Sequence, residues 1–278
     1  MKYLKRYVHL ARASKVLTVI LCFASIAPAQ AEGLRDATLR PGWLANDGSY
    51  YTALELTLST GWKTYWRAPG EYGYPPKIEY NGSTTLQKAE TIWPAPIVFG
   101  SDNMKTIGYL EHLVLPIKLT PIDAAQPIKL ELSAQLGICL DICVAIFLSF
   151  SQQLDPLQQS ADPETLLALE HQPVPRAQSN LQNLDCAFTP HEDAILITIG
   201  AAIPSLGAHE TLIIEYKQQN HWIIMEPTRR DGPMLHALGY LTDDTGAAPL
   251  SISRQKIQIT VIGSLGAADL GDCTAQPG

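Results

Sequence analysis

Two cysteines, Cys139 and Cys143, stand four residues apart in the segment GICLDIC (residues 137–143). In a fully extended strand their Cα atoms would lie about 13 Å apart, whereas a disulfide needs about 4.4–6.8 Å. Either the thiols stay unpaired or the chain turns between them. A tight turn would place them across a hairpin neck, where opposed Cα atoms are about 4.5–5.5 Å apart. A single helical turn would also bring residues i and i+4 together. We expect a reversible dithiol/disulfide that the rest of the chain presents.

The apolar pattern on both sides of the cysteines favours the hairpin. Every second residue from Ile128 to Ile138 is apolar, as in a half-buried strand, and this strand leads directly into Cys139. Another apolar strand, Val144–Phe150, leaves Cys143. Low charge, many Pro and Gly residues and many short apolar runs predict an all-β fold for the whole chain.

A second pair, Cys186 and Cys273, opens and closes a later series of predicted strands, and we expect these two to be joined. In the chain-entropy description, such a long loop gives about 4.6 kcal/mol of stabilisation, but the short Cys139–Cys143 loop gives only about 2 kcal/mol. This difference favours a structural Cys186–Cys273 disulfide and a reducible Cys139–Cys143 pair. The alternative is that the short pair merely staples a hairpin. Asp141 would disfavour a thiolate beside it, so we expect a dithiol that a partner attacks or activates.

The N-terminus has the features of a secretory signal peptide over residues 1–31. Basic residues from Lys2 to Lys15 precede an apolar run, Val16–Ile26, and an A-x-A site predicts cleavage after Ala31. Removing its five basic residues leaves 15 Lys and Arg against 27 Asp and Glu, a net charge of about −12. This acidic charge argues against a nucleic-acid partner. No later segment reaches the roughly 18 apolar residues of a membrane helix, so we expect no membrane span after signal removal. The signal peptide indicates export to the periplasm, where disulfides are permitted.

Composition divides the remaining chain into a first β domain at residues 32–152, a helix and linker at 153–180, and a companion β domain at 181–278. Within the first domain, the alternating run Tyr51–Leu58 predicts a strand. A long strand is expected over Gly108–Thr120, broken at Pro116 and placed at a sheet edge. Asn81-Gly82 predicts a type I′ turn. The remaining predicted elements are a helix capped at Asp162 and ending near Glu170, an extended linker at Gln172–Arg176, and strands at Ala194–Ile199, Thr211–Tyr216, His221–Met225 and Leu250–Ile262.

Two aromatic segments could fill a core or line a site. The segment GWKTYWRAPG (residues 61–70) places three aromatic residues within five positions before it breaks at Pro69-Gly70. The segment Ile92–Gly100 contains two prolines, which exclude a central strand, but its other side chains are strongly apolar. An aromatic core strand and a loop packed on the core are the structural interpretations. A lid over a site is the functional interpretation of Ile92–Gly100.

These motifs, taken in order, resemble a known family. The segments GWKTYWRAPG (61–70), WPAP (93–96), GY (108–109), LP (115–116) and the Cys139-x3-Cys143 pair are similar to the N-terminal periplasmic domain of the thiol:disulfide interchange protein DsbD. The form found in copper-sensitivity suppressor relatives is the most similar. The resemblance covers residues 35–152, and the second half of the chain looks like the companion β domain of those relatives.

The resemblance implies an immunoglobulin-like β-sandwich followed by a second, smaller β-sandwich. It also implies a thiol:disulfide oxidoreductase without a bound cofactor or metal. Electrons would pass from a thioredoxin-like or membrane-embedded reductase, acting in trans, through Cys139 and Cys143 to oxidised periplasmic proteins. A cap loop at Pro94–Lys105 would shield the disulfide, with Phe99 at its tip. We place Tyr65, Trp66 and Asp141 beside Phe99 as site-lining residues.

The chain departs from the family pattern after the second cysteine, where a proline is expected but Val144-Ala145-Ile146-Phe147 follows. Two other functions stay open. The same cysteines could bind or deliver copper, since thiolates suit Cu(I), with His112 as the sole histidine of the first domain; the few methionines argue against this. The chain could also be a non-catalytic β-sandwich adaptor whose cysteines are only structural.

Overall fold

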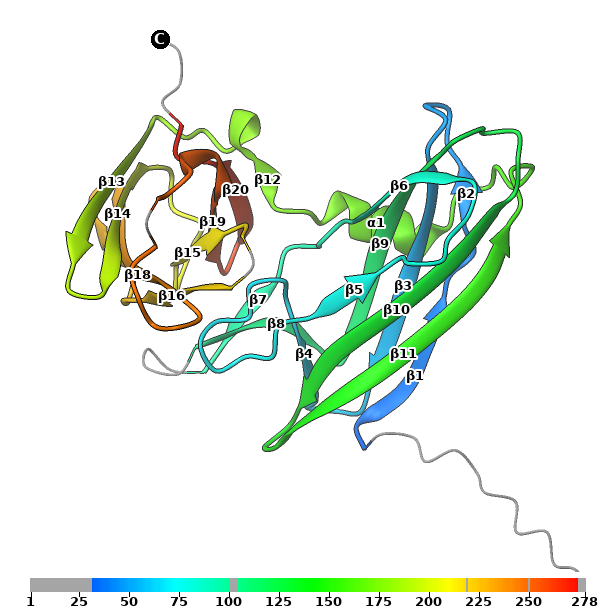
Figure 1. Cartoon of the computed structure of the whole chain (residues 1–278), viewed down its shortest axis with the longest axis horizontal. Helices are drawn as coiled ribbons and strands as arrows, with labels where there is room; N and C mark the ends of the chain where they lie inside the picture. The colour runs from blue at the N-terminus through cyan, green and yellow to red at the C-terminus, as the bar shows by residue number, and fades with distance from the viewer. Residues whose placement is uncertain (1–31, 101–104, 219, 250, 275–278) are drawn as a thin grey trace, which may run out of the picture. The chain divides into compact units, whose positions relative to one another are not determined.

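The protein is described by a computed structural model that covers residues 32–100, 105–218, 220–249 and 251–274. The fold is all-β, as predicted: an immunoglobulin-like β-sandwich is followed by a second, smaller β-sandwich (Figure 1). The predicted signal peptide and its cleavage site after Ala31 lie outside the described residues.

The first sandwich begins at Leu34 and ends at Leu154. Its strands are β1 (Leu34–Leu39), β2 (Trp43–Leu44), β3 (Tyr50–Leu58), β4 (Lys63–Tyr65), β5 (Lys77–Glu79), β6 (Leu86–Thr91), β7 (Ile97–Phe99), β8 (Thr106–Leu110), β9 (His112–Pro121), β10 (Ile128–Cys139) and β11 (Cys143–Leu154). One sheet runs in the order β1-β3-β9-β6, with β2 on β3. The other runs β11-β10-β4-β8-β7, with β5 on β10.

The core of this sandwich follows from strand alternation. The predicted strand at 51–58 forms as β3, and Leu54, Leu56 and Leu58 all point into the core. The alternating apolar residues of β10, from Ile128 to Ile138, are also buried there. The strand that carries the first cysteine is therefore held in place by its own apolar face.

Two local predictions for the first sandwich were wrong. The segment 108–120 divides into β8 and β9 at Glu111, whose φ of 61° reverses the chain there, and not at Pro116. Pro116 lies inside β9, which is flanked by β3 and β6 and is not an edge. It stands just beyond the last residue pair with β6, and its carbonyl accepts a hydrogen bond from Ile92. At Asn81-Gly82 only Gly82 has a positive φ, so this turn is not of type I′.

The second sandwich has its own core. Its strands are β12 (Val174–Pro175), β13 (Asn183–His191), β14 (Ala194–Ala202), β15 (Thr211–Tyr216), β16 (His221–Met225), β17 (Arg229–Asp231), β18 (Met234–Asp243), β19 (Ile257–Gly263) and β20 (Gly266–Gly271). One sheet runs β12-β20-β19-β15 and the other β13-β14-β18-β16, with β17 on β18. The strand expected at 250–262 begins only at Ile257, after a short 3₁₀ helix, Arg254–Lys256. The extended segment at 172–176 contains β12, which pairs in parallel with β20, before a 3₁₀ turn, Arg176–Gln178.

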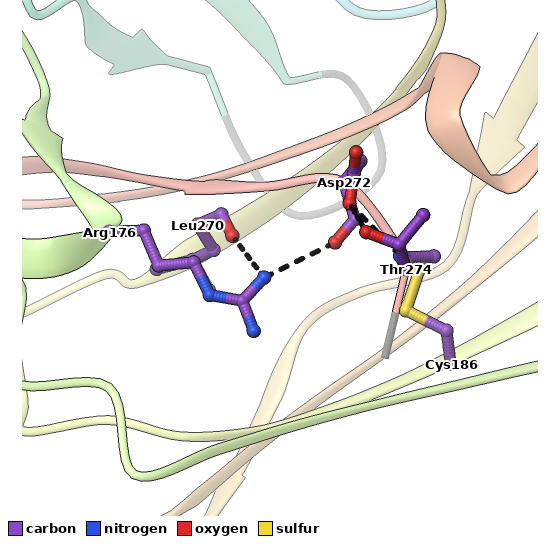
Figure 2. The surroundings of a disulfide bond; sticks show 6 residues. Arg176, Cys186, Leu270, Asp272 and Thr274 are labelled. Atoms are coloured by element: carbon purple, nitrogen blue, oxygen red, sulfur yellow. Dashed lines mark hydrogen bonds between the residues drawn. A yellow bond between two sulfur atoms is a disulfide. The ribbon is translucent and has the colours of Figure 1, made fainter. Parts of the chain in front are cut away.

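A disulfide joins Cys186 on β13 to Cys273 near the end of the described chain, with Cα atoms 5.8 Å apart and a sequence separation of 87 (Figure 2). Beside it, the Arg176 guanidinium donates to the carbonyls of Leu270 (3.2 Å) and Asp272 (3.4 Å). Cys273 is buried. This bridge and Arg176 together hold the last residues of the described chain against the second sandwich.

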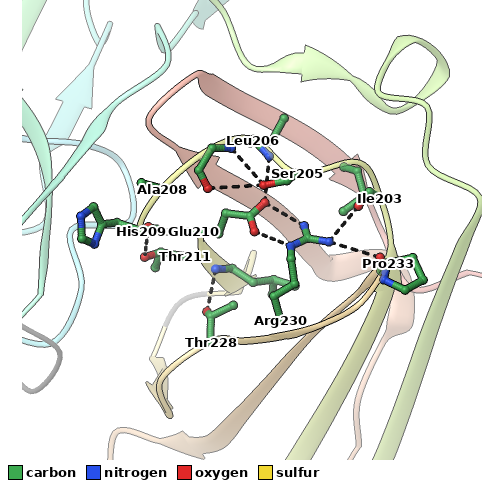
Figure 3. A network of polar contacts seen from close by, with 12 residues as sticks. Ile203, Ser205, Leu206, Ala208, His209, Glu210, Thr211, Thr228, Arg230 and Pro233 are labelled. Atoms are coloured by element: carbon green, nitrogen blue, oxygen red, sulfur yellow. Dashed lines mark hydrogen bonds and ion pairs between the residues drawn. The ribbon is translucent and has the colours of Figure 1, made fainter.

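A second polar cluster connects loops of the second sandwich through hydrogen bonds and an ion pair (Figure 3). The Arg230 guanidinium forms a double ion pair with Glu210, one of whose hydrogen bonds is 2.7 Å long. It also donates to the carbonyl of Ile203 at 3.0 Å. Glu210 in turn accepts from the Leu206 backbone N–H at 2.8 Å. The pair therefore satisfies loop backbone groups as well as its own charges.

Arg67, which follows β4 closely in sequence, links the two sandwiches. Its guanidinium donates to both carboxylate oxygens of Glu215 on β15, at 3.0 and 2.9 Å. The same group lies 3.9 Å from the ring centroid of the buried Trp66. Bidentate pairing and stacking on an aromatic face are both geometries that suit Arg and not Lys.

The predicted helix forms as α1 (Pro163–Glu170), with Asp162 as its N-cap. The Asp162 carboxylate accepts from the Thr165 backbone N–H at 2.9 Å, and Arg40 donates to it at 2.7 and 2.8 Å. Ala168 packs on Ala53 and Val114 of the first sandwich. Among the described residues, no helix is both long and apolar enough to cross a membrane.

Replacing Asp162 by Asn should destabilise the protein. The hydrogen bond from Arg40 lowers the pKa of Asp162 to about 2, below the unfolded value of about 3.9. Its contribution is therefore complete above the unfolded pKa and is lost as the pH falls through the folded pKa. We expect Asp162→Asn to cost about 2 kcal/mol near neutral pH and to flatten the loss of stability between about pH 4 and 2, measured by denaturant unfolding.

The matched control is Asp36→Asn, which changes an exposed carboxylate on β1. It should leave the free energy of unfolding within about 0.5 kcal/mol of the wild type. An Asp162→Asn protein with the wild-type stability and acid profile would show that the Arg40–Asp162 pair does not anchor α1.

Candidate redox site

The two cysteines of the short pair face each other at the neck of the β10–β11 hairpin. Residue pairing is continuous from Ile128 opposite Leu154 to Cys139 opposite Cys143, without a bulge. The sulfurs are bonded, and the Cα atoms are 4.2 Å apart. Residues 140–142 form the turn, across which the Leu140 N–H donates to the Ile142 carbonyl at 3.4 Å. The hairpin geometry, and not a helical turn, brings the sulfurs together.

The two halves of this disulfide differ sharply in exposure. Cys139 is 1% exposed, whereas Cys143 belongs to the exposed residues. The turn between them presents apolar side chains to solvent, with Leu140 47% and Ile142 77% exposed. Asp141 is also exposed at this tip. Cys143 is therefore accessible from solvent, while Cys139 is shielded.

Tyr65 contacts both sulfurs from the neighbouring strand. β4 pairs with the end of β10, placing Lys63 opposite Cys139. The Tyr65 hydroxyl lies 2.8 Å from Cys139 Sγ and 3.1 Å from Cys143 Sγ. Disulfide sulfurs carry no hydrogen, so the tyrosine O–H is the donor. Burial raises the pKa of Tyr65, which keeps the phenol protonated and able to donate at neutral pH.

Gly137 makes room for this tyrosine. A Cβ atom at Gly137 would lie 3.0 Å from Tyr65 Cδ2 and 2.5 Å from Tyr74 Cβ, so any side chain would push the rings away. Tyr74 is held over the strand by a hydrogen bond from the Gln135 side-chain amide. Neither Gly137 nor Tyr74 is among the site residues predicted from the sequence. The glycine itself is the sequence signal, because a glycine inside an apolar strand often marks a place where another part of the chain approaches the backbone closely.

The other predicted site residues take different positions. Trp66 alternates with Tyr65 and points the opposite way, fully buried in the core, so it packs the sandwich and does not line the disulfide. Phe99 ends β7, where its ring centroid lies 5.4 Å from Lys63 Nζ. Part of the predicted cap is therefore a strand, and residues 101–104 of it lie outside the described residues.

A regular strand begins at Cys143, where the family pattern would place a proline soon after the cysteine. Val144 and the residues after it continue directly into β11, which pairs with β10 as far as Leu154. A proline near the start of this strand would remove a backbone donor. In this chain the exposed cysteine is therefore the first residue of a long regular strand.

His112, the histidine considered for the copper alternative, has a carboxylate partner. His112 lies at the start of β9, and its Nε2 is hydrogen-bonded to Glu55 at 2.8 Å. Across the described ranges, no three or more His, Cys, Asp and Glu side chains gather where a metal ion could bind. The histidine therefore has a structural partner of its own.

Comparisons with known proteins bear on the first sandwich and on the fold. Residues 37–152 match the family model of the N-terminal domain of the thiol:disulfide interchange protein DsbD, so the first sandwich is similar to that domain. The whole fold resembles the crystal structure of the N-terminal periplasmic domain of ScsB from Proteus mirabilis. The TM-score is 0.61 at 22% identity, over 85% of this chain and 92% of that chain. A search of curated protein sequences found no match.

Tyr65→Phe should make the Cys139–Cys143 pair harder to reduce. Reduction converts the sulfurs into thiols or thiolates, and a hydrogen bond to a charged thiolate is stronger than one to a neutral disulfide. We expect the reduction potential to become about 10–30 mV more negative, as a net loss of about 0.5–1.4 kcal/mol requires. Equilibration with glutathione buffers, followed by alkylation and mass spectrometry, measures it.

Tyr109→Phe is the matched control, because the buried Tyr109 hydroxyl donates to the Pro94 carbonyl at 2.8 Å in the same sandwich. Its potential should equal that of the wild type. Equal shifts in both variants would mean that Tyr65 acts only through packing.

Proposed function

We propose that the protein is a periplasmic thiol–disulfide interchange module that passes electrons through Cys139 and Cys143. The observation that carries this proposal is the asymmetry of the disulfide in a DsbD N-terminal-like domain. One sulfur belongs to an exposed residue, and the other belongs to a shielded residue with a tyrosine O–H at 2.8 Å. The electron donor is a thioredoxin-like or membrane-embedded reductase in trans, and the acceptors are oxidised periplasmic proteins.

Reduction begins at Cys143. A donor thiolate attacks Cys143 Sγ, the Cys139–Cys143 bond breaks, and a mixed disulfide forms between Cys143 and the donor. Cys139 leaves as a thiolate. A second donor thiolate then attacks the donor sulfur of the mixed disulfide and releases Cys143. Two electrons have moved, the donor is oxidised to a disulfide, and the dithiol takes up protons according to its pKa values.

Oxidation by an acceptor reverses these roles. The Cys143 thiolate attacks a sulfur of the acceptor disulfide and displaces the other sulfur as a thiolate. Cys139 then attacks Cys143 Sγ, restores the internal disulfide and frees the reduced acceptor. The Tyr65 hydroxyl serves both directions, because it donates to the Cys139 sulfur when that sulfur is the leaving group or the attacking thiolate.

We further propose the domain division and the export route. Residues 1–31 act as the signal peptide, 32–152 as the redox domain, 153–180 as the helix and linker, and 181–278 as the companion domain. The Cys186–Cys273 disulfide serves stability, because its cysteines are separated by 87 positions in sequence and Cys273 is buried.

A Cys139→Ser variant should trap a mixed disulfide with the partner. It keeps the accessible Cys143 and lacks the sulfur that would resolve the complex. Non-reducing electrophoresis of a periplasmic extract, with mass spectrometry of the trapped species, should show a covalent complex through Cys143. Cys143→Ser is the control and should trap at least about tenfold less, since Cys139 is 1% exposed. If neither variant traps a partner, the protein is the non-catalytic adaptor and not an interchange module.

Phe99→Ala should speed the reduction of Cys139–Cys143 by a small thiol if Phe99 caps the site. Phe99 on β7 contacts Lys63 on β4 across the intervening strand β8, with the ring centroid 5.4 Å from Lys63 Nζ, and Lys63 pairs with Cys139 on β10. We expect an increase of about twofold to tenfold in the rate, from the loss of roughly 0.5–1.4 kcal/mol of shielding. Phe188→Ala, which removes a ring beneath Arg254 in the second sandwich, should leave the rate unchanged. An unaltered rate for Phe99→Ala would remove Phe99 from the site.

A further inference from the structure

The strand β11 forms an open edge of its sheet. It pairs with β10 along all 12 of its residues and ends the strand order β11-β10-β4-β8-β7 (Figure 1). Within the described part of the chain, no strand pairs with its other side. A strand of this length presents unpaired backbone donors and acceptors over about 40 Å.

This edge lacks the usual protection against pairing. From Cys143 to Leu154 the strand has no charged residue and no proline, and its pairing with β10 has no bulge. Natural edge strands are normally blunted by such features. The outward-facing Phe147 is 74% exposed. On the core side, Val144, Leu148 and Phe150 are only partly buried. An added strand would cover these side chains.

The order of side chains along β11 suits a second copy of the same strand. A two-fold axis at Phe147, normal to the sheet, would pair the strand with itself in the antiparallel direction. Ile146 would then face Leu148 of the second copy, and Val144 would face Phe150. Every cross-strand pair on the core face from 144 to 150 would thus be apolar. On the outer face, the two Phe147 rings would meet at the axis, an aromatic pair of the kind that stabilises sheets.

The charges at the ends of the strand also permit this register. Asp141 lies in the turn before β11 and Asp155 lies just after the strand, so both fall outside the paired stretch, which has no charged residue of its own. No two acidic residues would face each other directly, so like-charge repulsion does not oppose the pairing. The second copy would extend the sheet in its own plane and place Ser151, a small residue, beside Cys143. The outer face that carries the disulfide would stay open.

We propose that β11 is a dimerisation edge, which pairs antiparallel with β11 of a second copy about a two-fold axis at Phe147. The interface is isologous, because the same strand contributes to both sides. It joins two sheets into one continuous sheet and leaves a redox pair near each end of the shared strands. This inference does not depend on the redox function, since the same edge would pair if the cysteines were structural.

Sedimentation of the full mature chain tests the proposal. The wild type should sediment as a dimer in exchange with monomer, from micromolar to submillimolar concentrations. Phe147→Glu would place two carboxylates opposite each other at the axis. Their repulsion should reduce the sedimenting species from a dimer to a monomer. Leu265→Glu is the matched control, because Leu265 is 80% exposed on the second sandwich and far from β11 in sequence; it should stay dimeric. A wild type that is monomeric throughout this range, or a Phe147→Glu protein that is still dimeric, would overturn the proposal.

Single-cysteine cross-linking tests the register. In a Cys139→Ser, Cys143→Ser background, Phe147→Cys should cross-link to itself under mild oxidation, because opposed Cα atoms at the axis would be about 4.5–5.5 Å apart. Ser149→Cys is the control. Its two copies would lie about 14 Å apart along the strands, so it should not cross-link. Equal cross-linking at both positions, or none at position 147, would refute a two-fold axis at Phe147. Absence of cross-linking at 147 is also the result expected if β11 binds a strand of another protein.

Discussion

Side chains alternate along a strand, so a slip of one residue between β10 and β11 would send the two cysteines to opposite faces of the sheet. The continuous pairing from Ile128–Leu154 to Cys139–Cys143 prevents this slip. It is fixed by the apolar residues of β10, which are buried in the core of the first sandwich. The position of the disulfide is therefore set by packing along the hairpin and not by the short turn alone.

The neighbouring strand then makes the two sulfurs unequal. Tyr65 reaches them only because Gly137 has no side chain in its way. Its buried O–H lies closest to the sulfur of the shielded residue, while Cys143 stays open to solvent. The two residues after Tyr65 anchor the end of β4. Trp66 packs in the core of the first sandwich, and Arg67 forms an ion pair with Glu215 of the second sandwich. The companion domain thus contacts the segment that carries the tyrosine.

Much of this arrangement follows from the sequence. The alternation of β3 and β10 and the helix cap at Asp162 depend on local patterns, and these elements form where expected. Long-range packing decides the rest. Pro116 lies within an interior strand because its missing N–H falls beyond the pairing with β6, which no local pattern reveals. Trp66 and Tyr65 are adjacent aromatic residues that point to opposite faces of the sheet. Only the pairing of β4 with β10 shows that Tyr65 lies on the face that carries the disulfide. Gly137 matters through a contact with residues more than sixty positions away.

The reduction potential of the Cys139–Cys143 pair in the wild-type protein distinguishes an exchanging disulfide from a structural one. An exposed disulfide that closes a loop of a few residues contributes little to stability, so a visiting dithiol can reduce it. A role in disulfide exchange predicts a potential near or above about −230 mV, in the range of proteins that exchange disulfides. A value below about −300 mV, typical of structural disulfides, would contradict it.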